Sequence, residues 1–553
     1  MFGQDSALAR HIIDRFEELK TERNRRAEEL DMIARLYQPQ RQGFRGESRD
    51  QWNLHKLFNS TTLVSASNAT ASLYSTLCNP ANRWFQATSG DDDLDQFHSV
   101  AAWNDIVTRR MLASFRPSVS NFYQSAVSWT ADDVILGTGI MVSDEAPQSR
   151  SGRRIIDTCV SPADAVFGVD AWGISDELIV ERRLDPVQAA RFYGAENLPE
   201  AIREKAVAGK RDVKTSYLQA MQPNDAYTPG KLGVKGKPYV STHVCVEGRA
   251  VTRQGGQSEQ SFAIARWMVD GQESWGRGLG YLNLASGTKL QAQERDNLQA
   301  GALAARPPIG TTGSKASRRD AQLAPGKFLH GAVSYTGQQL VRPIFTHQGL
   351  PVTIDMVRAT KEEVENGWHA ALLSLVGRTG LGNLEVIERM EERLRLQAPY
   401  LGRMQTEGLA PVLERRFSIL WRAGQIPPPP QEMKGKPLEM RFTSVAAMAQ
   451  KAQEGVAVSR LLEDASKLAA VHPDPQSVWD NVDEDGAIQV LAEARGVPAG
   501  ALRSIEDRKA LREGRAKAQQ AEQAMAVAQQ GASIAKDAAA AGPGLQELMG
   551  GMA

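Results

Sequence analysis

The sequence predicts an α+β protein that is mainly helical and contains two or more packed regions. Three observations lead to this fold class. The 553 residues exceed what one hydrophobic core usually serves. Apolar residues recur at three- and four-residue spacings over much of the chain, which is typical of amphipathic helices. Two stretches of the first half are rich in β-branched residues and interrupted by Pro and Gly, which indicates strands.

A long amphipathic helix is predicted at residues 6–37. Ile12 and Phe16 belong to its apolar spacing, and Pro39 closes the run. Residues 20–29 are almost wholly polar, a pattern that favours a solvated face. A helix of this length with a polar middle commonly spans between packed regions.

The rest of the first half combines helices with strands. A helical run rich in small residues covers 57–85, and a second covers 104–135. Gly137-Thr138-Gly139 then breaks the helical pattern before a short strand at 140–142. Further strands are predicted within 154–180 and 239–269.

The second half has an unusual order of elements. A helix is predicted at 288–305, and a segment rich in Gly, Ser and basic residues follows at 306–348. A second helix at 353–375, a glycine loop at 377–382 and a long helix at 384–421 come next.

A stiff linker at Pro427–Pro430 precedes the C-terminal helices, which are predicted at 444–470, 485–495 and 504–541. The last is rich in Ala, Gln and basic residues and poor in large apolar ones. Such a helix is either frayed or stabilised by neighbours in an oligomer.

The composition excludes several classes of protein. Lys+Arg and Asp+Glu both total 65, so the whole surface does not indicate a nucleic-acid or membrane partner, and any DNA contact must be local. The three cysteines lack C-x-x-C spacing, which argues against disulfides, zinc and redox pairs and fits a reducing compartment. Neither a secretory signal nor a run of about 18 to 20 apolar residues occurs, so no membrane span is expected.

Signatures of enzymes are missing. The phosphate-binding loop G-x-x-x-x-G-K-[ST] is absent, and Gly310–Lys315 lacks its spacing. The segment Gly276–Gly280 contains G-x-G without a third glycine in register. No G-x-S-x-G elbow occurs, and the eight histidines show no paired spacing for a metal. We therefore expect no catalytic residues, no cofactor and no metal.

Two acidic segments imitate metal sites. Asp91–Asp95 is interpreted as a solvated charge run after a turn. Asn481–Gly486 resembles the start of a calcium loop, but position twelve is Ala492, and the carboxylate of Glu493 comes one residue later. Helix capping is the better interpretation of the second segment.

Residues 266–278 read RWMVDGQESWGRG. Considered alone, this segment predicts that Trp267 and Trp275 are core residues and that its glycines turn the chain. It also resembles the signature of bacteriophage head-to-tail connecting (portal) proteins, in which R-W, a turn, G-E and aromatic-G-R-G precede a long helix. The matching residues are Arg266, Trp267, Gly271, Glu273, Trp275, Gly276, Arg277 and Gly278. Gln272 is an insertion, and Leu279 stands where proline is frequent.

Other segments resemble the same family in the same order. They are Arg35–Pro39, Asn79–Phe85, Ala305–Pro308 and, more weakly, Met440–Ser444. Together they extend the resemblance over about residues 10 to 500. The segment 266–278 and the extended C-terminal region resemble the portals of short-tailed double-stranded DNA phages in particular.

The resemblance implies a portal fold with wing, stem, clip and crown regions that assembles as a dodecameric ring with a central channel. The implied regions are an N-terminal helical and α+β wing at 1–280, a stem helix at 281–305, a clip at 306–350, a second stem helix at 351–376, a tunnel loop at 377–384, a long wing helix at 385–425, a crown at 426–503 and an Ala-rich helical barrel or tail at 504–553.

Two implied surfaces carry the candidate site residues. The clip is locally basic, and Lys315, Arg318, Arg319 and Lys327 are candidates for docking partners; solvated loop charge is the alternative. The tunnel loop is implied to project into the channel, where glycine allows sharp turns. Its candidate residues are Gly377, Arg378, Thr379, Gly380, Gly382 and Asn383, with a plain helix connection as the alternative.

Charges on the helix that follows the clip fit passage of DNA better than tight binding. Asp355, Glu362, Glu363 and Glu365 outnumber Arg358 and Lys361. Each cation that pairs with a phosphate releases counterions and holds the DNA, so a uniformly basic channel would impede sliding.

The implied function is that of a portal protein at one capsid vertex, located in the virion and assembled in the host bacterial cytoplasm. It would pass the genome during packaging and ejection and would not be an enzyme. The implied partners are eleven further copies, the terminase large subunit, the head–tail adaptor and tail proteins, the scaffolding and major capsid proteins, and DNA bound non-specifically. The alternatives are another capsid or long-tailed phage portal component and, more remotely, a packaging enzyme.

Overall fold

The computed structural model describes residues 6–46, 57–95, 97–145, 155–271, 273–305, 309–311, 328–330, 334–338, 350–368, 401–443, 445–472, 475–495, 497, 501–503 and 507–525. They divide between two compact units. The first comprises Met1–Gln86, Arg109–Ile426 and Phe442–Met448; the second comprises Ala87–Thr108, Pro427–Arg441 and Ala449–Ala553.

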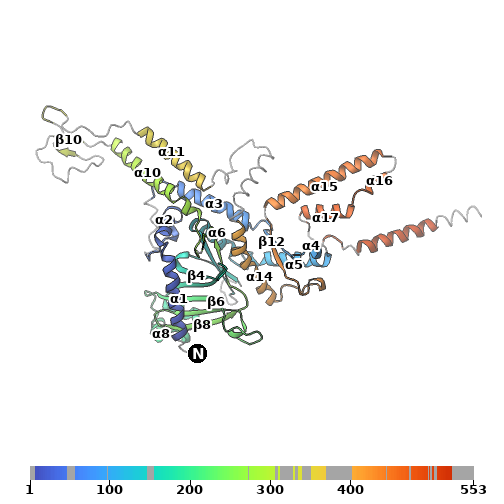
Figure 1. Ribbon diagram of the computed structural model, residues 1–553, viewed down its shortest axis with the longest axis horizontal. Helices are drawn as coiled ribbons and strands as arrows, with labels where there is room; N and C mark the ends of the chain where they lie inside the picture. Colours follow the sequence, from blue (N-terminus) through green and yellow to red (C-terminus); the bar gives the residue numbers. More distant parts are fainter. Residues whose placement is uncertain are drawn as a thin grey trace, which may run out of the picture. The chain divides into compact units, whose positions relative to one another are not determined.

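A five-stranded antiparallel sheet organises the first unit (Figure 1). Side chains along a strand alternate between its two faces, so Ile179 points to one face and its neighbours Leu178 and Val180 to the other. The strands in spatial order are β4 (Ala165–Val169), β5 (Ser175–Leu184), β6 (Thr215–Pro223), β7 (Tyr239–Cys245) and β8 (Ala250–Gln257).

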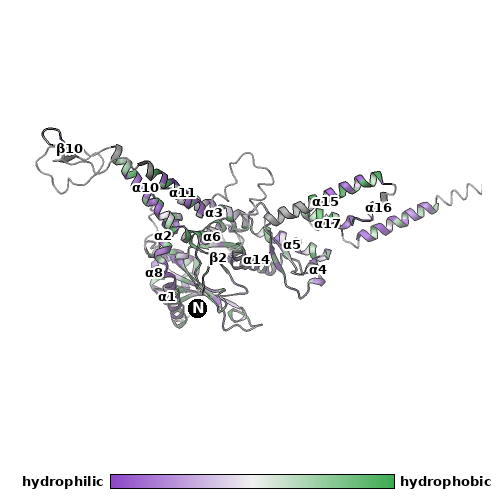
Figure 2. Cartoon of the chain, turned by 45° about the horizontal axis from the view of Figure 1, so that its top comes forward, coloured by the Kyte–Doolittle hydropathy of each residue, from purple (hydrophilic) through white to green (hydrophobic). Residues whose placement is uncertain are grey.

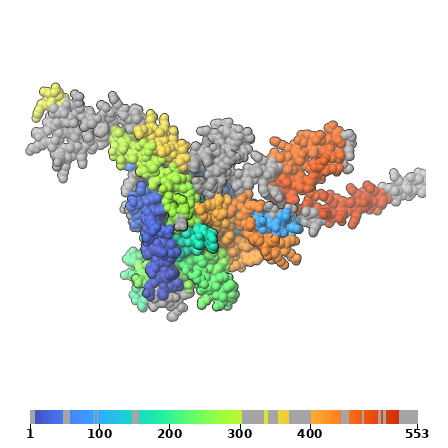
Figure 3. Space-filling view, viewed as in Figure 1, coloured from blue at the N-terminus to red at the C-terminus, as the bar shows by residue number. Residues whose placement is uncertain are grey.

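Helix α1 (Ser6–Asn24) covers one face of this sheet. Ile12 and Phe16 pack with Ile179 and Leu218 in one buried cluster, as their helical spacing predicts. Figure 3 shows α1, in dark blue, at the surface of the unit, and residues on its other side, such as Arg10 and Asp14, are outside the buried cluster.

A three-stranded sheet packs on the opposite face. Its order is β3 (Ile155–Val160), β2 (Thr138–Glu145) and β9 (Phe262–Arg266). Ile140 and Phe262 share a core with Leu178 of the larger sheet. Farther along that face, α7 (Pro186–Tyr193) and α8 (Glu200–Val207) cover Tyr217.

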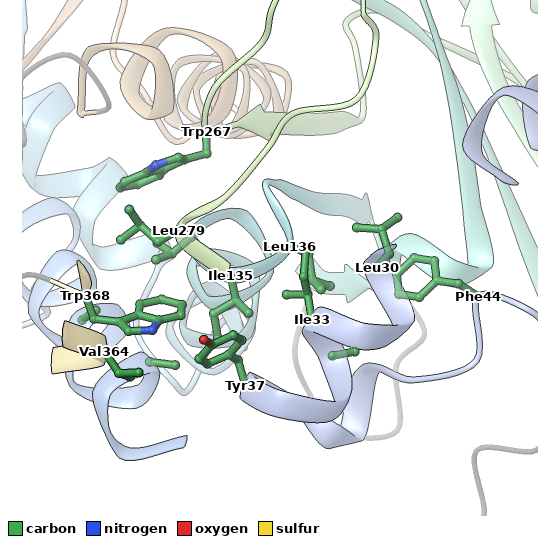
Figure 4. Close-up of a cluster of buried hydrophobic side chains, with 14 of the residues drawn as sticks. Leu30, Ile33, Tyr37, Phe44, Ile135, Leu136, Trp267, Leu279, Val364 and Trp368 are labelled. Carbon is green, nitrogen blue, oxygen red and sulfur yellow. The ribbon is translucent and has the colours of Figure 1, made fainter. Parts of the chain in front are cut away.

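The helical part of the first unit packs around a second core, shown in Figure 4. The helices are α2 (Ala27–Tyr37), α3 (Thr61–Leu77), α6 (Phe122–Leu136), α9 (Leu279–Leu282), α10 (Leu284–Ala305) and α11 (Leu350–Gly367). A π-helix at Met404–Leu409 leads into α14 (Ala410–Arg422). Two short strands, β10 (Ile309–Thr311) and β11 (Phe328–His330), pair in parallel.

The second unit is mostly helical. It contains α4 (Asp92–Asp95), most of α15 (Val445–Val471), α16 (Pro475–Trp479), α17 (Glu484–Ala494) and a helix at residues 507–525. Trp103 Nε1 donates to Pro427 O over 2.9 Å. The helix at 507–525 is mostly hydrophilic in Figure 2, and it is held to α17 by Arg508 and Arg512, which pair with Asp485 at 3.0 and 2.8 Å.

Two predicted helices are each divided in the structure. The run at 6–37 is two helices, because Arg25 N and Arg26 N bond to carbonyls three residues back and end α1 there. The run at 104–135 is α5 (His98–Ser114) followed by α6. Pro117 lies between them and marks the boundary, because proline breaks a helical pattern.

Candidate functional site at the Arg266–Gly278 segment

Arg266 joins three parts of the first unit. It lies at the end of β9, opposite Thr138 of β2, and only 3% of its surface is exposed. Its Nε and Nη2 donate to the Glu407 carboxylate of the π-helix over 2.8 and 3.0 Å. Nη2 also donates to Gly173 O, in the turn between β4 and β5, over 2.6 Å. The guanidinium therefore ties a strand, the π-helix and a hairpin turn together.

A buried carboxyl group lies near this ion pair. Asp133 of α6 is fully buried, and its burial raises its pKa well above the usual range. The negative charge of Glu407 adds to the shift, and Arg403 opposes it. Arg403 also pairs with Glu407 at 3.0 Å. Two guanidinium groups therefore balance the largely buried Glu407 carboxylate, while Asp133 favours its neutral form.

The glycines of the segment allow backbone to pack directly on backbone. Gly137 has φ +91°, and a Cβ atom there would lie 2.4 Å from Gly278 N. A Cβ atom on Gly278 would lie 2.5 Å from Val134 O, and one on Gly276 would lie 2.1 Å from Gly137 O. No side chain fits at these positions, so the end of α6 and the G-R-G turn require glycine.

Backbone hydrogen bonds hold the same crossing. Trp267 N donates to Gly137 O over 3.0 Å, and Gly276 N donates to Thr138 Oγ1 over 3.0 Å. Within the segment, Arg277 N donates to Met268 O over 2.7 Å. The segment therefore folds as a loop closed on the Gly137–Gly139 break.

The two tryptophans enter different cores. Trp267 points toward Leu279 in the helical core (Figure 4). Trp275 packs in the core between the sheets, with its ring centroid 4.7 Å from that of Phe167. The segment thus connects two cores, and both tryptophans are packing residues rather than a binding surface.

The remaining residues of the segment lie nearer the surface. Arg277 Nη2 donates to Glu273 Oε1 over 2.7 Å, and its guanidinium lies 5.0 Å from the Tyr281 ring centroid. Gly271 forms the turn with φ +56°, and open space surrounds the position of a Cβ atom there.

The polar middle of the N-terminal run is only partly a solvated face: Thr21, Asn24, Arg25 and Glu28 are exposed, but other charged residues of this stretch make internal contacts. Arg23 is buried and donates to Ala163 O over 2.6 Å. Arg26 Nη1 donates to Gly276 O over 2.9 Å, and Ser274 Oγ donates to Glu22 Oε1 over 2.8 Å. Arg26 and Glu22 therefore bond to the 266–278 segment, and Arg23 bonds to a carbonyl group elsewhere in the first unit. The spacing of charged residues in the sequence does not distinguish such contacts from solvation.

The helices α10 and α11 lie side by side next to this segment (Figures 1 and 3). Ser286 Oγ and Lys289 Nζ donate to the Glu363 carboxylate over 2.6 and 3.1 Å, and these contacts lower the pKa of Glu363. Lys361 Nζ lies 3.7 Å from Glu294 Oε1. Of the charges considered for a channel, Glu363 and Lys361 therefore face α10, while Asp355, Arg358, Glu362 and Glu365 are exposed.

Two groups of predicted site residues lie outside the described residues. They are the clip candidates Lys315, Arg318, Arg319 and Lys327, and the tunnel-loop candidates Gly377, Arg378, Thr379, Gly380, Gly382 and Asn383.

The acidic segments that imitate metal sites make local hydrogen bonds. Asp483 Oδ1 accepts from the N–H groups of Asp485 and Gly486, both over 3.1 Å, which confirms the predicted helix cap. Asp95 Oδ1 accepts from Ser89 N and Asn104 Nδ2. Across the described ranges, no cluster of three His, Cys, Asp or Glu side chains is arranged to hold a metal, and no helix is long and apolar enough to cross a bilayer.

The chain is similar to known proteins over most of its length. The model of the family "Bacteriophage head to tail connecting protein" matches residues 9–502, which include all of 266–278. The "Portal protein" of Salmonella phage epsilon15 is 28% identical over 499 residues, covering 88% of this chain and 87% of the relative. The "Probable portal protein" of Bordetella phage BPP-1 is 25% identical over 541 residues, covering 95% and 94%. A solved structure, "Neck of empty GTA particle computed with C6 symmetry", matches with a TM-score of 0.30 and 9% identity, covering 74% of this chain and 88% of that one.

Proposed function

The chain belongs to the bacteriophage head-to-tail connecting protein family, and we propose that it is the portal subunit of a short-tailed phage, a structural channel protein at one capsid vertex. The family match over residues 9–502 carries this proposal and confirms the resemblance first seen in Arg266–Gly278. The relatives in phages epsilon15 and BPP-1, named as portal proteins, support it over nearly their whole length. The chain then passes DNA into the head and releases it at infection without a catalytic step of its own.

The proposal assigns the chain to a dodecameric ring. The exposed helix at 507–525 supports assembly, since its exposed and mostly hydrophilic surface builds no core within one chain. In a ring, equivalent helices have neighbours to pack against.

The proposed regions follow the order of elements. The paired helices α10 and α11 are the two stem helices, because they lie side by side and are separated in sequence by the segment assigned to the clip. The sheets and N-terminal helices form the wing, the linker after Ile426 leads to the crown, and the tunnel loop at 377–384 projects into the channel. The proposed boundaries are those predicted from the resemblance.

The clip is proposed to dock the terminase during packaging and the tail adaptor afterwards. The double substitution Arg318→Glu/Arg319→Glu should weaken binding of both partners, because it reverses the charge of a basic surface. The matched control is Lys210→Glu/Arg211→Glu, an adjacent basic pair that is exposed after α8. Intact binding by the clip variant in a pull-down assay would contradict this role.

Genetic complementation tests the function as a whole. A phage from which the gene for this chain has been deleted should form DNA-filled heads only when the chain is supplied in the cells of that phage's host. Heads that fill with DNA equally well without the chain would contradict the proposed function. The content of the heads is measured by electron microscopy and by nuclease-protected DNA.

A further inference from the structure

The turn between β4 and β5 presents a tryptophan to solvent. Trp172 is 85% exposed and Ile174 is 60% exposed. An indole this exposed is uncommon away from interfaces, where tryptophan is enriched as an anchor.

The turn holds the backbone at this tryptophan in place. Asp170 Oδ1 accepts from the N–H groups of Trp172 and Ile174, both over 2.8 Å. Gly173 adopts φ +79°, and its carbonyl accepts from Arg266. The motif arginine thereby anchors the turn, so its backbone does not have to be ordered when the indole binds a partner.

A pocket lies at the other end of β5. It is open to solvent, has a volume of about 310 Å³ and is lined by Arg182, Leu184, Gln188, Arg191 and Phe192. The Arg182 guanidinium lies 6.0 Å from the centroid of the half-exposed Phe192 ring. Aliphatic, aromatic and guanidinium walls together suit an aromatic guest.

The tryptophan and the pocket of one chain cannot meet. Trp172 precedes the first residue of β5, whereas Arg182 and Leu184 close the strand at its last residues. At about 3.4 Å per residue, the strand separates them by roughly 30 Å. Since each chain carries both features on one rigid sheet, a contact between them must join two copies head to tail, and such contacts generate rings when the rotation closes.

The charges around the two features are complementary. Asp170 and Asp176 flank the turn that carries the tryptophan, and Arg182 and Arg191 belong to the pocket. We propose that Trp172 of one copy inserts into the Arg182–Phe192 pocket of the next copy. This inference rests on the proposed ring and identifies one of the contacts that close it.

Full-length variants test the contact by their assembly. Trp172→Ala and Phe192→Ala should each raise the protein concentration at which half the chains are in rings by about 30-fold, the effect of an interface hot spot. The matched control Leu232→Ala removes a side chain that is 97% exposed elsewhere in the first unit and should change this concentration less than about twofold. Mass photometry over a dilution series measures the distribution. If Phe192→Ala does not fold, as judged by circular dichroism, Arg191→Glu on exposed α7 replaces it.

Mixing the two variants tests the head-to-tail geometry. The Phe192→Ala chain retains the tryptophan and the Trp172→Ala chain retains the pocket, so an equal mixture should form heterodimers through one intact contact. Because other contacts of the ring remain in both variants, native mass spectrometry should show these heterodimers in excess of their statistical share over the two homodimers. Folded variants that never form heterodimers would overturn the proposed contact.

The outcomes separate this contact from the portal proposal. Rings of Trp172→Ala that persist at wild-type concentrations overturn the contact and leave the portal function standing. The proposed contact is also overturned, and the portal function left standing, if Trp172→Ala leaves the rings intact and abolishes binding of another virion protein. That protein would then be the partner that covers Trp172. A wild-type chain that stays monomeric contradicts the portal proposal itself.

Discussion

Arg266 and Glu407, 141 residues apart in the chain, form a two-bond ion pair whose donor–acceptor distances are 2.8 and 3.0 Å. The pair connects the last residue of β9 to the π-helix, and the same guanidinium holds the β4–β5 turn. The most recognisable arginine of the sequence thus has a structural role, since it orients elements that belong to three separate stretches of chain.

Removal of one partner of this pair should destabilise the first unit strongly. Arg266→Ala leaves Glu407, whose side chain is largely buried, beside Asp133 without its main cation, so we expect a loss of about 3 kcal/mol in the free energy of unfolding. The control Arg183→Ala removes a side chain that is 65% exposed and should cost less than about 0.5 kcal/mol. Urea unfolding followed by tryptophan fluorescence measures both, and equal losses would refute the structural role.

The backbone crossing at the G-R-G turn should not tolerate a methyl group. Gly278→Ala places Cβ 2.5 Å from Val134 O, a distance that forces the backbone apart, and we expect a loss of about 3 kcal/mol or more. Gly255→Ala is the matched control, because open space surrounds that position and the change should stay within about 0.5 kcal/mol. The yield of soluble protein and the urea midpoint report the difference; a Gly278→Ala protein of normal stability would show that the crossing is looser than described.

The stability of the α1–α2 junction should depend on Arg26 and not on Arg25. Arg26→Ala removes charge-assisted bonds to the carbonyls of Trp275 and Gly276, which should cost about 2 kcal/mol. Arg25 is exposed, and Arg25→Ala should have little effect. Hydrogen exchange should show faster opening of α1 and of the motif only in the Arg26 variant. If hydrogen exchange of α1 and of the motif is the same in Arg26→Ala as in the wild type, the Arg26 side chain is solvated at the junction.

His243 should make stability fall in acid. Burial, followed by the charges of Arg182 and Arg253, lowers its pKa to about 3, while the unfolded side chain titrates near 6.5. As the pH falls below 6.5, the unfolded chain takes up a proton that the folded chain does not, so stability decreases toward pH 3 by about 1.4 kcal/mol per unit.

The comparison of wild type with His243→Gln isolates this effect, since other titrating groups, Asp133 among them, are present in both. Between pH 7.5 and pH 5.0, the wild type should lose about 2 kcal/mol more than the variant. Equal losses in urea titrations at the two pH values would mean that His243 is solvated or protonated in the folded chain.

Sequence patterns predicted most helices, from apolar spacing in the run that contains α1 and α2 and from helical composition in α10 and α15. They did not predict β6, whose Gln219, Ala220 and Met221 have no strong strand preference and are buried by the neighbouring strands. They located the Arg266 motif but not Glu407, since a carboxylate within a helical pattern carries no sign of a distant partner. The charges of Arg23 and Arg26 were misinterpreted for the same reason: only the folded chain brings carbonyl groups to them.

Electron microscopy of the purified full-length protein decides whether this chain forms a channel. We expect rings with a central channel and twelve-fold symmetry, in which α10 and α11 of each copy form the stem. Persistent monomers, or closed particles without a channel, would contradict it.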